Sequence, residues 1–553
     1  MDPRTPRRWL LPVLLAAAVA VRLVHWWAVR DEPFFSWLAM DSQEYDRWAQ
    51  GIAAGDWTGS QVFFQAPLYP YALGLLYAVF GRSLDAVYLV QIALAVAGCW
   101  ALYRAGREMG GERVGLAAAG LAAFYGPFLF HDVQLLKESA AVTVTSFLLW
   151  SLSARRWLAA GLLLGVLALL RENALLLLPF LLPLVAGKGF LRRAGALIGG
   201  LFLTLLPVAV RNGVVGGDFL PTTFQGGVNF YIGNNPEADG TYQPIVPGKQ
   251  IPTLERQEPV RIAEGELGRK LTAGEVSSFW MRKALAWATD HPGDFLRLQL
   301  RKLRMFWSWY EWPDAVDYYW VRGLSPALRF SWVEFGAVTL LALASLWMVR
   351  RNPGPFAPAL LFALGWMLST VVFFLFSRYR LPAVPALMIL AAVPIARISE
   401  KPRPLPILGL LAALLLPHLA GFQPRLDLVH YNLGRIEDER GNPDAAREHY
   451  KAAFILNPRD FLACLNLGNH AARSGDWGTA LRFFLRAEAL EPRSDDVQSN
   501  LGGVYLALGD LQEAKARFDR ALALNPQNAA ALHNREILER RLSVSERSAG
   551  TPR

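Results

Sequence analysis

The chain has 553 residues, of which 53% are hydrophobic, and it carries a formal net charge of +10 at pH 7. This composition is too apolar for a soluble protein, and the length allows more than one domain. The Lys and Arg residues stand in short clusters between apolar runs and form no continuous basic face, which excludes nucleic acid as the expected partner. The two cysteines, Cys99 and Cys464, predict no disulfide framework.

Apolar runs close to the length of a membrane span recur from Trp9 to Gly421. A helix needs about 20 apolar residues to cross the hydrocarbon core, so we predict an all-α polytopic membrane domain with about 11 spans. The predicted centres are residues 10–29, 85–103, 114–130, 139–153, 157–170, 174–187, 194–210, 331–349, 357–376, 382–396 and 405–421.

The first of these runs follows the basic segment MDPRTPRRW and continues through Val29. Two interpretations are open, a signal peptide cleaved after Ala18, Val19 and Ala20 or an uncleaved signal anchor. The length of the run favours the anchor. Both interpretations place Asp41 outside the cytoplasm.

The basic clusters predict the orientation, because short cytoplasmic loops are enriched in Lys and Arg. The clusters alternate with the remaining loops if residues 66–81 form an interfacial helix instead of a span. The loop at Asp41, the segment 211–330 and the C-terminus then lie outside the cytoplasm. Cytoplasmic clusters are expected at residues 4–8, 104–113, 155–156, 188–193, 350–351 and 397–403.

The polar loop DSQEYD begins at Asp41 and carries two further carboxylates, Glu44 and Asp46. Helical spacing would place Asp41 and Glu44 on one face. These carboxylates are either general acid–base groups or part of a solvated loop in which Asp41 caps an interfacial helix. The spacing by itself leaves both interpretations open.

Other outward residues also allow two interpretations each. Glu138 and Arg171 lie at outer helix ends, as capping and turn residues or as parts of a site. Arg378, Tyr379 and Arg380 begin an outward helix end, where such residues either anchor at the interface or bind an anion. The aromatic stretch RMFWSWYEWPDAVDYYW suits interface anchoring more than sugar stacking.

After the last predicted span an internal repeat appears. The triplet Asn-Leu-Gly recurs every 34 residues, at Asn432, Asn466 and Asn500. This period, with small residues at packing positions, is typical of tetratricopeptide repeats, which offer a surface to a protein partner or serve as a spacer. We predict a membrane domain over residues 1–421, repeats over 425–541 and a disordered tail over 542–553.

The order of the outward motifs resembles that of the GT-C glycosyltransferases over about residues 9–397. These motifs are the Asp41 loop, Pro67-Leu68-Tyr69, RENALLLLP from Arg171 and SRYRLPAVPAL from Ser377. Within that superfamily the chain is most similar to family 39, the protein O-mannosyltransferase and aminoarabinose transferase group. The segment NFYIGNNPEADG, residues 229–240, is similar to bacterial members that carry C-terminal tetratricopeptide repeats.

The resemblance implies an inverting transfer of a sugar from a polyprenyl-phosphate donor to a protein or glycan acceptor outside the cytoplasmic membrane. It implies Asp41 as the general base, with Glu44 and Glu138 as fallbacks, because many relatives have an Asp-Glu pair where this chain has Asp41-Ser42. The groups implied at the donor phosphate are Arg171, Arg378, Tyr379 and Arg380. Tyr69, Asn234 and Asn235 are weaker candidates for substrate contacts, and an Asn-Asn-Pro turn is the plainer interpretation of the last two.

No resident cofactor is expected, because no His or Cys pair shows ligand spacing. A magnesium or manganese ion would have to use Asp41, Glu44, Asp46 and Glu138 with water. Two rival functions remain, a noncatalytic tetratricopeptide scaffold for an envelope complex and a transporter. The enzyme hypothesis predicts Asp41, Arg378 and Arg380 around one outward cavity continuous with the lipid. It loses its basis if Asp41 lies more than about 15 Å from both arginines without such a cavity, since proton abstraction needs near-contact geometry.

Overall fold

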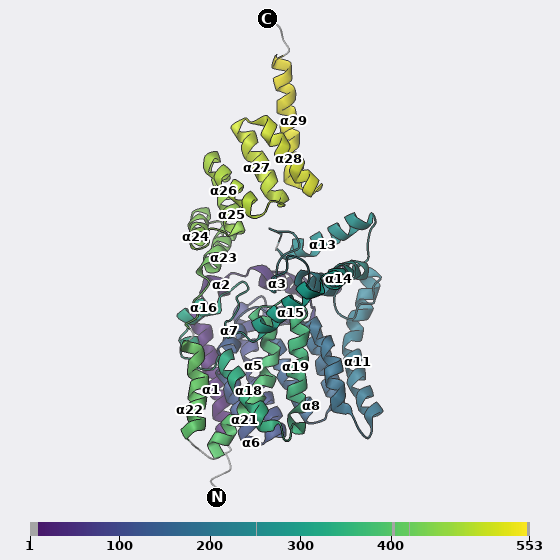
Figure 1. Cartoon of the computed structure of the whole chain (residues 1–553), viewed down its shortest axis with the longest axis vertical. Coiled ribbons are helices and arrows are strands. Elements are labelled where there is room, and N and C mark those ends of the chain that lie inside the picture. Colours follow the sequence, from purple (N-terminus) through teal and green to yellow (C-terminus); the bar gives the residue numbers. More distant parts are fainter. Residues whose placement is uncertain (1–8, 250, 401–403, 420, 550–553) are drawn as a thin grey trace. The chain divides into compact units, whose positions relative to one another are not determined.

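The computed structural model describes residues 9–249, 251–400, 404–419 and 421–549 (Figure 1). These residues form helices and loops without a β-strand, which confirms the predicted all-α class. The chain divides into two compact units. One unit holds residues up to Gln243 together with 259–424, and the other holds residues 244–258 together with the repeats from Arg425 onward.

Apolar helices dominate the first unit. Five of the described helical segments are long and apolar enough to cross a membrane: Leu10–Val29 (α1), Leu84–Gly110 (α5), Phe190–Gly216 (α11), Gly354–Val371 (η3 and α19) and Ser377–Ile398 (α20, η4 and α21). Shorter apolar helices include Leu68–Phe80 (α4), Trp157–Leu170 (α9) and Phe335–Val349 (α18). Helices α8 (Glu138–Ser153) and α22 (Pro404–Leu419) coincide with two more predicted spans. The count of about 11 remains a prediction.

Two predicted spans are broken in the structure. The span expected at 114–130 consists of α6 (Glu112–Ala123) and α7 (Gly126–Asp132), because the chain turns at Tyr125, where the Gly126 amide donates to the Val333 carbonyl at 3.0 Å. The span expected at 174–187 is a series of short turns, η1 (Glu172–Leu177), α10 (Leu178–Leu181) and η2 (Leu182–Val185). Pro179 and Pro183 explain this break, because proline lacks the amide donor of a regular helix.

The loop DSQEYD is helical. It lies in α3 (Met40–Ala53), which packs on α4. Asp46 holds the two helices together: it is buried, accepts a hydrogen bond from the Tyr77 hydroxyl at 2.7 Å and pairs with Arg82 at 3.0 Å. Asp46 therefore has a structural role that follows from its contacts.

The segment predicted to lie outside, residues 211–330, is mostly helical and, apart from residues 244–258, groups with the first unit. Its helices are α12 (Gln225–Gly233), α13 (Pro252–Leu267), α14 (Ala273–Asp290), α15 (Pro292–Phe306), α16 (Tyr318–Leu324) and α17 (Pro326–Arg329). Residues 244–258 are the exception, because they group with the repeats. The chain between Phe306 and Tyr318 is irregular and carries part of the site described below.

The repeats form helix pairs with the predicted 34-residue period. The helices are α23 (Leu426–Glu439), α24 (Pro443–Leu456), α25 (Phe461–Arg473), α26 (Trp477–Leu490), α27 (Asp495–Leu508), α28 (Leu511–Leu524) and α29 (Ala529–Ala549). The glycine of each Asn-Leu-Gly triplet packs against an aromatic ring of the next helix; a Cβ atom on Gly468 or Gly502 would lie 2.5 Å from Phe484 or Phe518. Helix α29 continues through most of the expected disordered tail, and residues 550–553 lie outside the described residues.

Candidate active site

Asp41 lies in the first turn of α3 and contacts an arginine from the far end of the chain. The N-cap residue of α3 is Ala39, and no side chain caps this end, so the interpretation of Asp41 as a helix cap is wrong. Instead Asp41 Oδ2 accepts a hydrogen bond from Arg378 Nη2 at 2.8 Å, across 337 residues of sequence. The proximity that the enzyme hypothesis required is therefore met.

Arg378 is the centre of an ion-pair cluster. It lies in the short helix α20 (Ser377–Arg380), and its side chain is only 9% exposed. Its Nη2 atom lies 2.8 Å from Asp41 and 2.6 Å from Asp314, and its Nη1 atom lies 3.8 Å from Glu138. Three carboxylates from distant segments thus converge on one guanidinium.

Arg171 completes the buried side of this cluster. Its Nη2 atom pairs with Glu138, which is fully buried at the start of α8. The Arg171 guanidinium also lies 4.5 Å from the centre of the Tyr379 ring. The predicted residues Asp41, Glu138, Arg171, Arg378 and Tyr379 are therefore in one place.

Several polar atoms of the cluster are buried without a partner. Among the described residues no hydrogen bond reaches Glu138 Oε2, Arg171 Nε or Arg378 Nε. Buried polar atoms are nearly always satisfied in folded proteins, and exceptions call for an explanation such as a bound group or a catalytic role. Their concentration here marks the cluster as a candidate site for a polar substrate.

Asp314 is a member of the site that the sequence did not reveal. It lies between α15 and α16, inside the aromatic stretch that was predicted to anchor the protein at the interface. The side chain of Asp314 is 32% exposed and that of Asp41 is 24% exposed, so these two carboxylates are the accessible ones of the three. No local pattern marks Asp314, because its role depends on contact with Arg378.

Lys137 is a second residue of the site for which the sequence predicted no role, although it adjoins Glu138 in the loop HDVQLLKES. It precedes α8, is buried, and lies 6.0 Å from the centre of the Tyr45 ring. Within the part of the chain that the structure describes, no carboxylate comes within ion-pairing distance of its ammonium group. The carboxylates of Glu172, Glu138 and Asp41 act on its charge from beyond ion-pairing distance, so the ammonium group is available to an incoming anion.

The environments of the two accessible carboxylates push their pKa values apart. Burial raises the pKa of Asp41, but Arg378, Lys137 and Arg171 outweigh this effect and hold the pKa below its usual value. Burial raises the pKa of Asp314; Arg378 opposes this shift, while Asp41 and Glu138 add to it. Asp41 is the better base, and Asp314 is the carboxylate more readily protonated.

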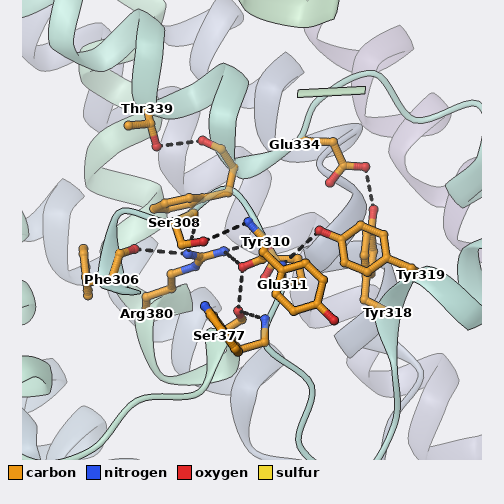
Figure 2. A network of polar contacts seen from close by, with 12 residues as sticks. Phe306, Ser308, Tyr310, Glu311, Tyr318, Tyr319, Glu334, Thr339, Ser377 and Arg380 are labelled. Atoms are coloured by element: carbon orange, nitrogen blue, oxygen red, sulfur yellow. Dashed lines mark hydrogen bonds and ion pairs between the residues drawn. The ribbon is translucent and has the colours of Figure 1, made fainter. Parts of the chain in front are cut away.

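Arg380 has a different environment from Arg378. Figure 2 shows its guanidinium surrounded by backbone carbonyls of the irregular segment. Its Nη1 atom donates to the carbonyls of Phe306 at 3.1 Å and Ser308 at 2.5 Å, and its Nη2 atom pairs with Glu311 at 2.8 Å. Arg380 is fully buried and makes these bonds within its own fold, so the geometry gives it an anchoring position and not a place in the cluster.

Glu44 and Tyr69 also lie apart from the cluster. Glu44 forms an ion pair with Arg47 at 3.7 Å, one turn along α3. Tyr69 is buried and donates its hydroxyl to Gln91 at 2.6 Å. Neither residue contacts Asp41 or Arg378 through these bonds.

The two asparagines of the Asn-Asn-Pro segment are engaged at the end of α12. Asn234 is fully buried, and its amide donates to the carbonyls of Phe230 and Val372, each at 2.8 Å. The Asn235 amide donates to the Tyr231 carbonyl at 2.9 Å. These contacts favour the turn interpretation of both residues.

The carboxylates named for a magnesium or manganese ion are not gathered. Asp46 is bound to Tyr77 and Arg82, and Glu44 is next to Arg47. Within the described ranges no group of three His, Cys, Asp or Glu residues could hold a metal ion. The residues present do not form the donor set that was considered for such an ion.

Comparison with known families agrees with this picture. Residues 65–211 match the family model described as dolichyl-phosphate-mannose-protein mannosyltransferase. This range contains Lys137, Glu138 and Arg171. Residues 431–495 and 471–535 each match a tetratricopeptide repeat model. No curated protein matches the chain in sequence.

Solved structures show distant similarity. ArnT from Cupriavidus metallidurans bound to undecaprenyl phosphate has 16% identity and a TM-score of 0.43, over 86% of this chain and 80% of that chain. The apo oligosaccharyltransferase of Archaeoglobus fulgidus has 13% identity and a TM-score of 0.43, over 74% of this chain and 55% of that chain. The first tetratricopeptide domain of human RPAP3 has 25% identity and a TM-score of 0.21, over 22% of this chain and 98% of that chain.

These likenesses are too distant to carry an argument about chemistry. The match of residues 65–211 confirms the predicted resemblance to this glycosyltransferase group, and the two repeat matches confirm the tetratricopeptide repeats. The family match supports glycosyltransferase activity in general and a multi-pass membrane protein.

Proposed function

We propose that the protein is an inverting glycosyltransferase that moves a sugar from a polyprenyl-phosphate donor to a hydroxyl or amine of a protein or glycan acceptor on the outer face of the cytoplasmic membrane. The observation that carries this proposal is the contact of Asp41 with Arg378, a candidate base beside a candidate phosphate ligand. The match of residues 65–211 to a family named for a lipid-phosphate sugar and a protein acceptor supports it.

Asp41 is the proposed general base. The acceptor oxygen or nitrogen attacks the anomeric carbon while its proton passes to the Asp41 carboxylate. The bond from that carbon to the phosphate oxygen breaks, and the electron pair leaves with the lipid phosphate. Asp41 suits this role because its carboxylate is partly exposed and nearby cations keep it ionised.

The cations of the cluster are the proposed ligands of the leaving phosphate. Phosphate departs as a stable anion, so it gains from fixed positive charge and needs no proton. Arg378 supplies two donor nitrogens, and Lys137 supplies an ammonium group that forms no ion pair with a carboxylate of the described residues. Arg171 and Tyr379 are next to these cations, and the Arg171 guanidinium lies over the Tyr379 ring.

Asp314 is proposed to take up a proton when the donor phosphate binds. The formal charges of the site cancel without the donor, and a donor phosphate adds negative charge. The charged groups are the carboxylates of Asp41, Glu138 and Asp314 and the cations of Lys137, Arg171 and Arg378. Asp314 shares Arg378 Nη2 with Asp41, and its raised pKa makes it the carboxylate that takes up a proton as the phosphate binds. Arg380 is proposed to hold the segment that positions Asp314, through the carbonyls of Phe306 and Ser308.

Replacement of Asp41 tests the proposal. Cells lacking the protein are complemented with wild type, Asp41→Asn or Glu44→Gln, and their envelope proteins and glycans are compared by mass spectrometry. We expect a sugar modification that disappears in the deletion, stays absent with Asp41→Asn at normal protein level and returns with Glu44→Gln. A modification that returns with Asp41→Asn would remove Asp41 as the base.

A noncatalytic scaffold is the second candidate, and the repeats are the observation that favours it. A scaffold would leave the sugar profile unchanged in the deletion strain while envelope complexes are lost. The enzyme proposal predicts the opposite result.

A further inference from the structure

The repeat unit contains an acidic pocket that is built around two aspartates. Asp495 and Asp496 begin α27, and Asn525 and Asn528 approach them from the turn between α28 and α29. Both asparagine amides donate to Asp495 Oδ2 at 2.8 Å, and the Asn528 amide also lies 3.3 Å from Asp496 Oδ1. The asparagines therefore orient the Asp495 carboxylate and leave its Oδ1 atom for another donor.

A lysine of the same unit fills this pocket. Lys249 Nζ donates to Asp496 Oδ2 at 2.7 Å and lies 3.6 Å from Asp495 Oδ1. Lys249 belongs to the segment 244–258, which precedes the repeats by more than 160 residues and yet groups with them. Burial lowers the pKa of Lys249, but Asp496 and Asp495 outweigh this effect and raise it, so the ammonium is charged in the pocket.

The backbone presents this lysine on a tight turn. The Lys249 amide donates to the Val246 carbonyl at 3.1 Å, and Gly248 takes a positive φ of 84°. Proline followed by glycine, as in Pro247-Gly248, is typical of such a turn. Within residues 244–249, Lys249 is the only buried residue, and Glu258 is buried near the other end of the segment.

We propose that the pocket of Asp495, Asp496, Asn525 and Asn528 is a lysine-binding site of the repeats, occupied in the resting protein by Lys249 and opened to a lysine of a partner polypeptide when the turn of residues 244–249 withdraws. The charge-assisted bonds and the oriented carboxylate define the ligand as an ammonium group. Residues 244–248 are only partly buried, so Lys249 can exchange with a lysine on a competing turn. The pocket does not depend on the reaction proposed for the membrane unit.

Peptide binding to the full-length protein in detergent tests this proposal. The probe is a fluorescein-labelled peptide with the sequence of residues 243–251, and its partner has alanine in place of lysine. If Lys249 fills the pocket about nine-tenths of the time, its removal raises the apparent affinity about tenfold. We expect this gain for Lys249→Ala with the lysine peptide, no gain with the alanine peptide, and loss of the gain when Asp496→Asn is added.

Two further variants separate occupancy from a general disturbance of the fold. Lys249→Arg keeps a cation in the pocket and is expected to bind the peptide as weakly as wild type. Lys270→Ala removes an exposed lysine paired with Glu264 at 2.7 Å and is expected to change nothing. Equal binding by wild type and Lys249→Ala, or an equal gain for both peptides, would overturn the proposal.

Hydrogen exchange of the wild-type protein gives an independent measurement that needs no variant. Excess lysine peptide is expected to speed the exchange of amides in residues 244–249, because it displaces that turn. Unchanged exchange with the peptide bound would contradict a shared pocket.

Discussion

Lys137 is a buried cation whose ammonium group no carboxylate contacts among the described residues. Burial of such a charge lowers the stability of the fold. A destabilising residue of this kind is retained where function requires it. Under the proposed function, the anion that Lys137 binds is the phosphate of the donor, because Lys137 and Asp41 interact electrostatically.

Replacement of Lys137 by methionine separates a functional role from a structural one. Lys137→Met keeps most of the side-chain volume and removes the charge. We expect the KM for the donor to rise about tenfold or more, since a charged hydrogen bond contributes about 1.5–3 kcal/mol, while the melting temperature stays level or rises. A lower melting temperature with unchanged KM would assign Lys137 to the fold.

The acid limb of the pH–rate profile tests Asp41 together with its partner. The cations around Asp41 hold its pKa below the usual value, so the carboxylate stays ionised as the pH falls from about 8 to about 5. We expect kcat/KM to show no acid limb from Asp41 in that range. Arg378→Gln removes the largest opposing charge and raises the Asp41 pKa, so the acid limb should move to higher pH. An unmoved limb would mean that Asp41 is not the titrating base.

At the scale of elements, close packing of glycine on an aromatic ring holds each pair of repeat helices together. The same contact recurs at Gly434 with Tyr450, at Gly468 with Phe484 and at Gly502 with Phe518. The 34-residue period is therefore a period of backbone-to-ring packing. A methyl group at these positions has no space unless the helices move apart.

Two adjacent glycines of α27 provide a matched comparison. Gly502→Ala places a Cβ atom 2.5 Å from the Phe518 ring, and such overpacking costs about 1–3 kcal/mol. A Cβ atom on Gly503 would have only Asn534 Nδ2 nearby, at 3.9 Å, so Gly503→Ala should be neutral or stabilising by up to about 1 kcal/mol. Hydrogen exchange of α27 and α28 in the full chain measures both. Equal exchange in the two variants would contradict this account of the repeat.

For the whole molecule, the predicted topology places the repeats outside the cytoplasm and the loop at Lys188 inside. The native cysteines, Cys99 and Cys464, are buried, so new surface cysteines can be labelled selectively. An impermeant thiol reagent on intact spheroplasts should label Ser474→Cys and spare Lys188→Cys, which should react only after permeabilisation. The reverse pattern would place Asp41 on the cytoplasmic side and remove an extracytoplasmic reaction.

Part of the fold follows from the sequence because its signals are local. Runs of apolar residues predict membrane helices, and the 34-residue period predicts the repeats, since each unit packs mainly on its neighbour in sequence. Prolines within the runs were the exception: Pro179 and Pro183 break a predicted span into short turns, because each removes a backbone donor.

The candidate site was predictable only in part, because its contacts are between distant segments. Sequence order suggested Asp41 and Arg378, but helix geometry separated Arg378 from Arg380, since residues two apart on a helix do not share a face. No sequence pattern near Asp314 or Lys137 predicts a role in the site. The contact of Asp314 with Arg378 and the burial of Lys137 distinguish them from other charged residues. The sequence by itself determined the membrane helices, the repeats and the acidic loop; the tertiary structure decided which charges meet, because electrostatic partnership depends on distance in space and not along the chain.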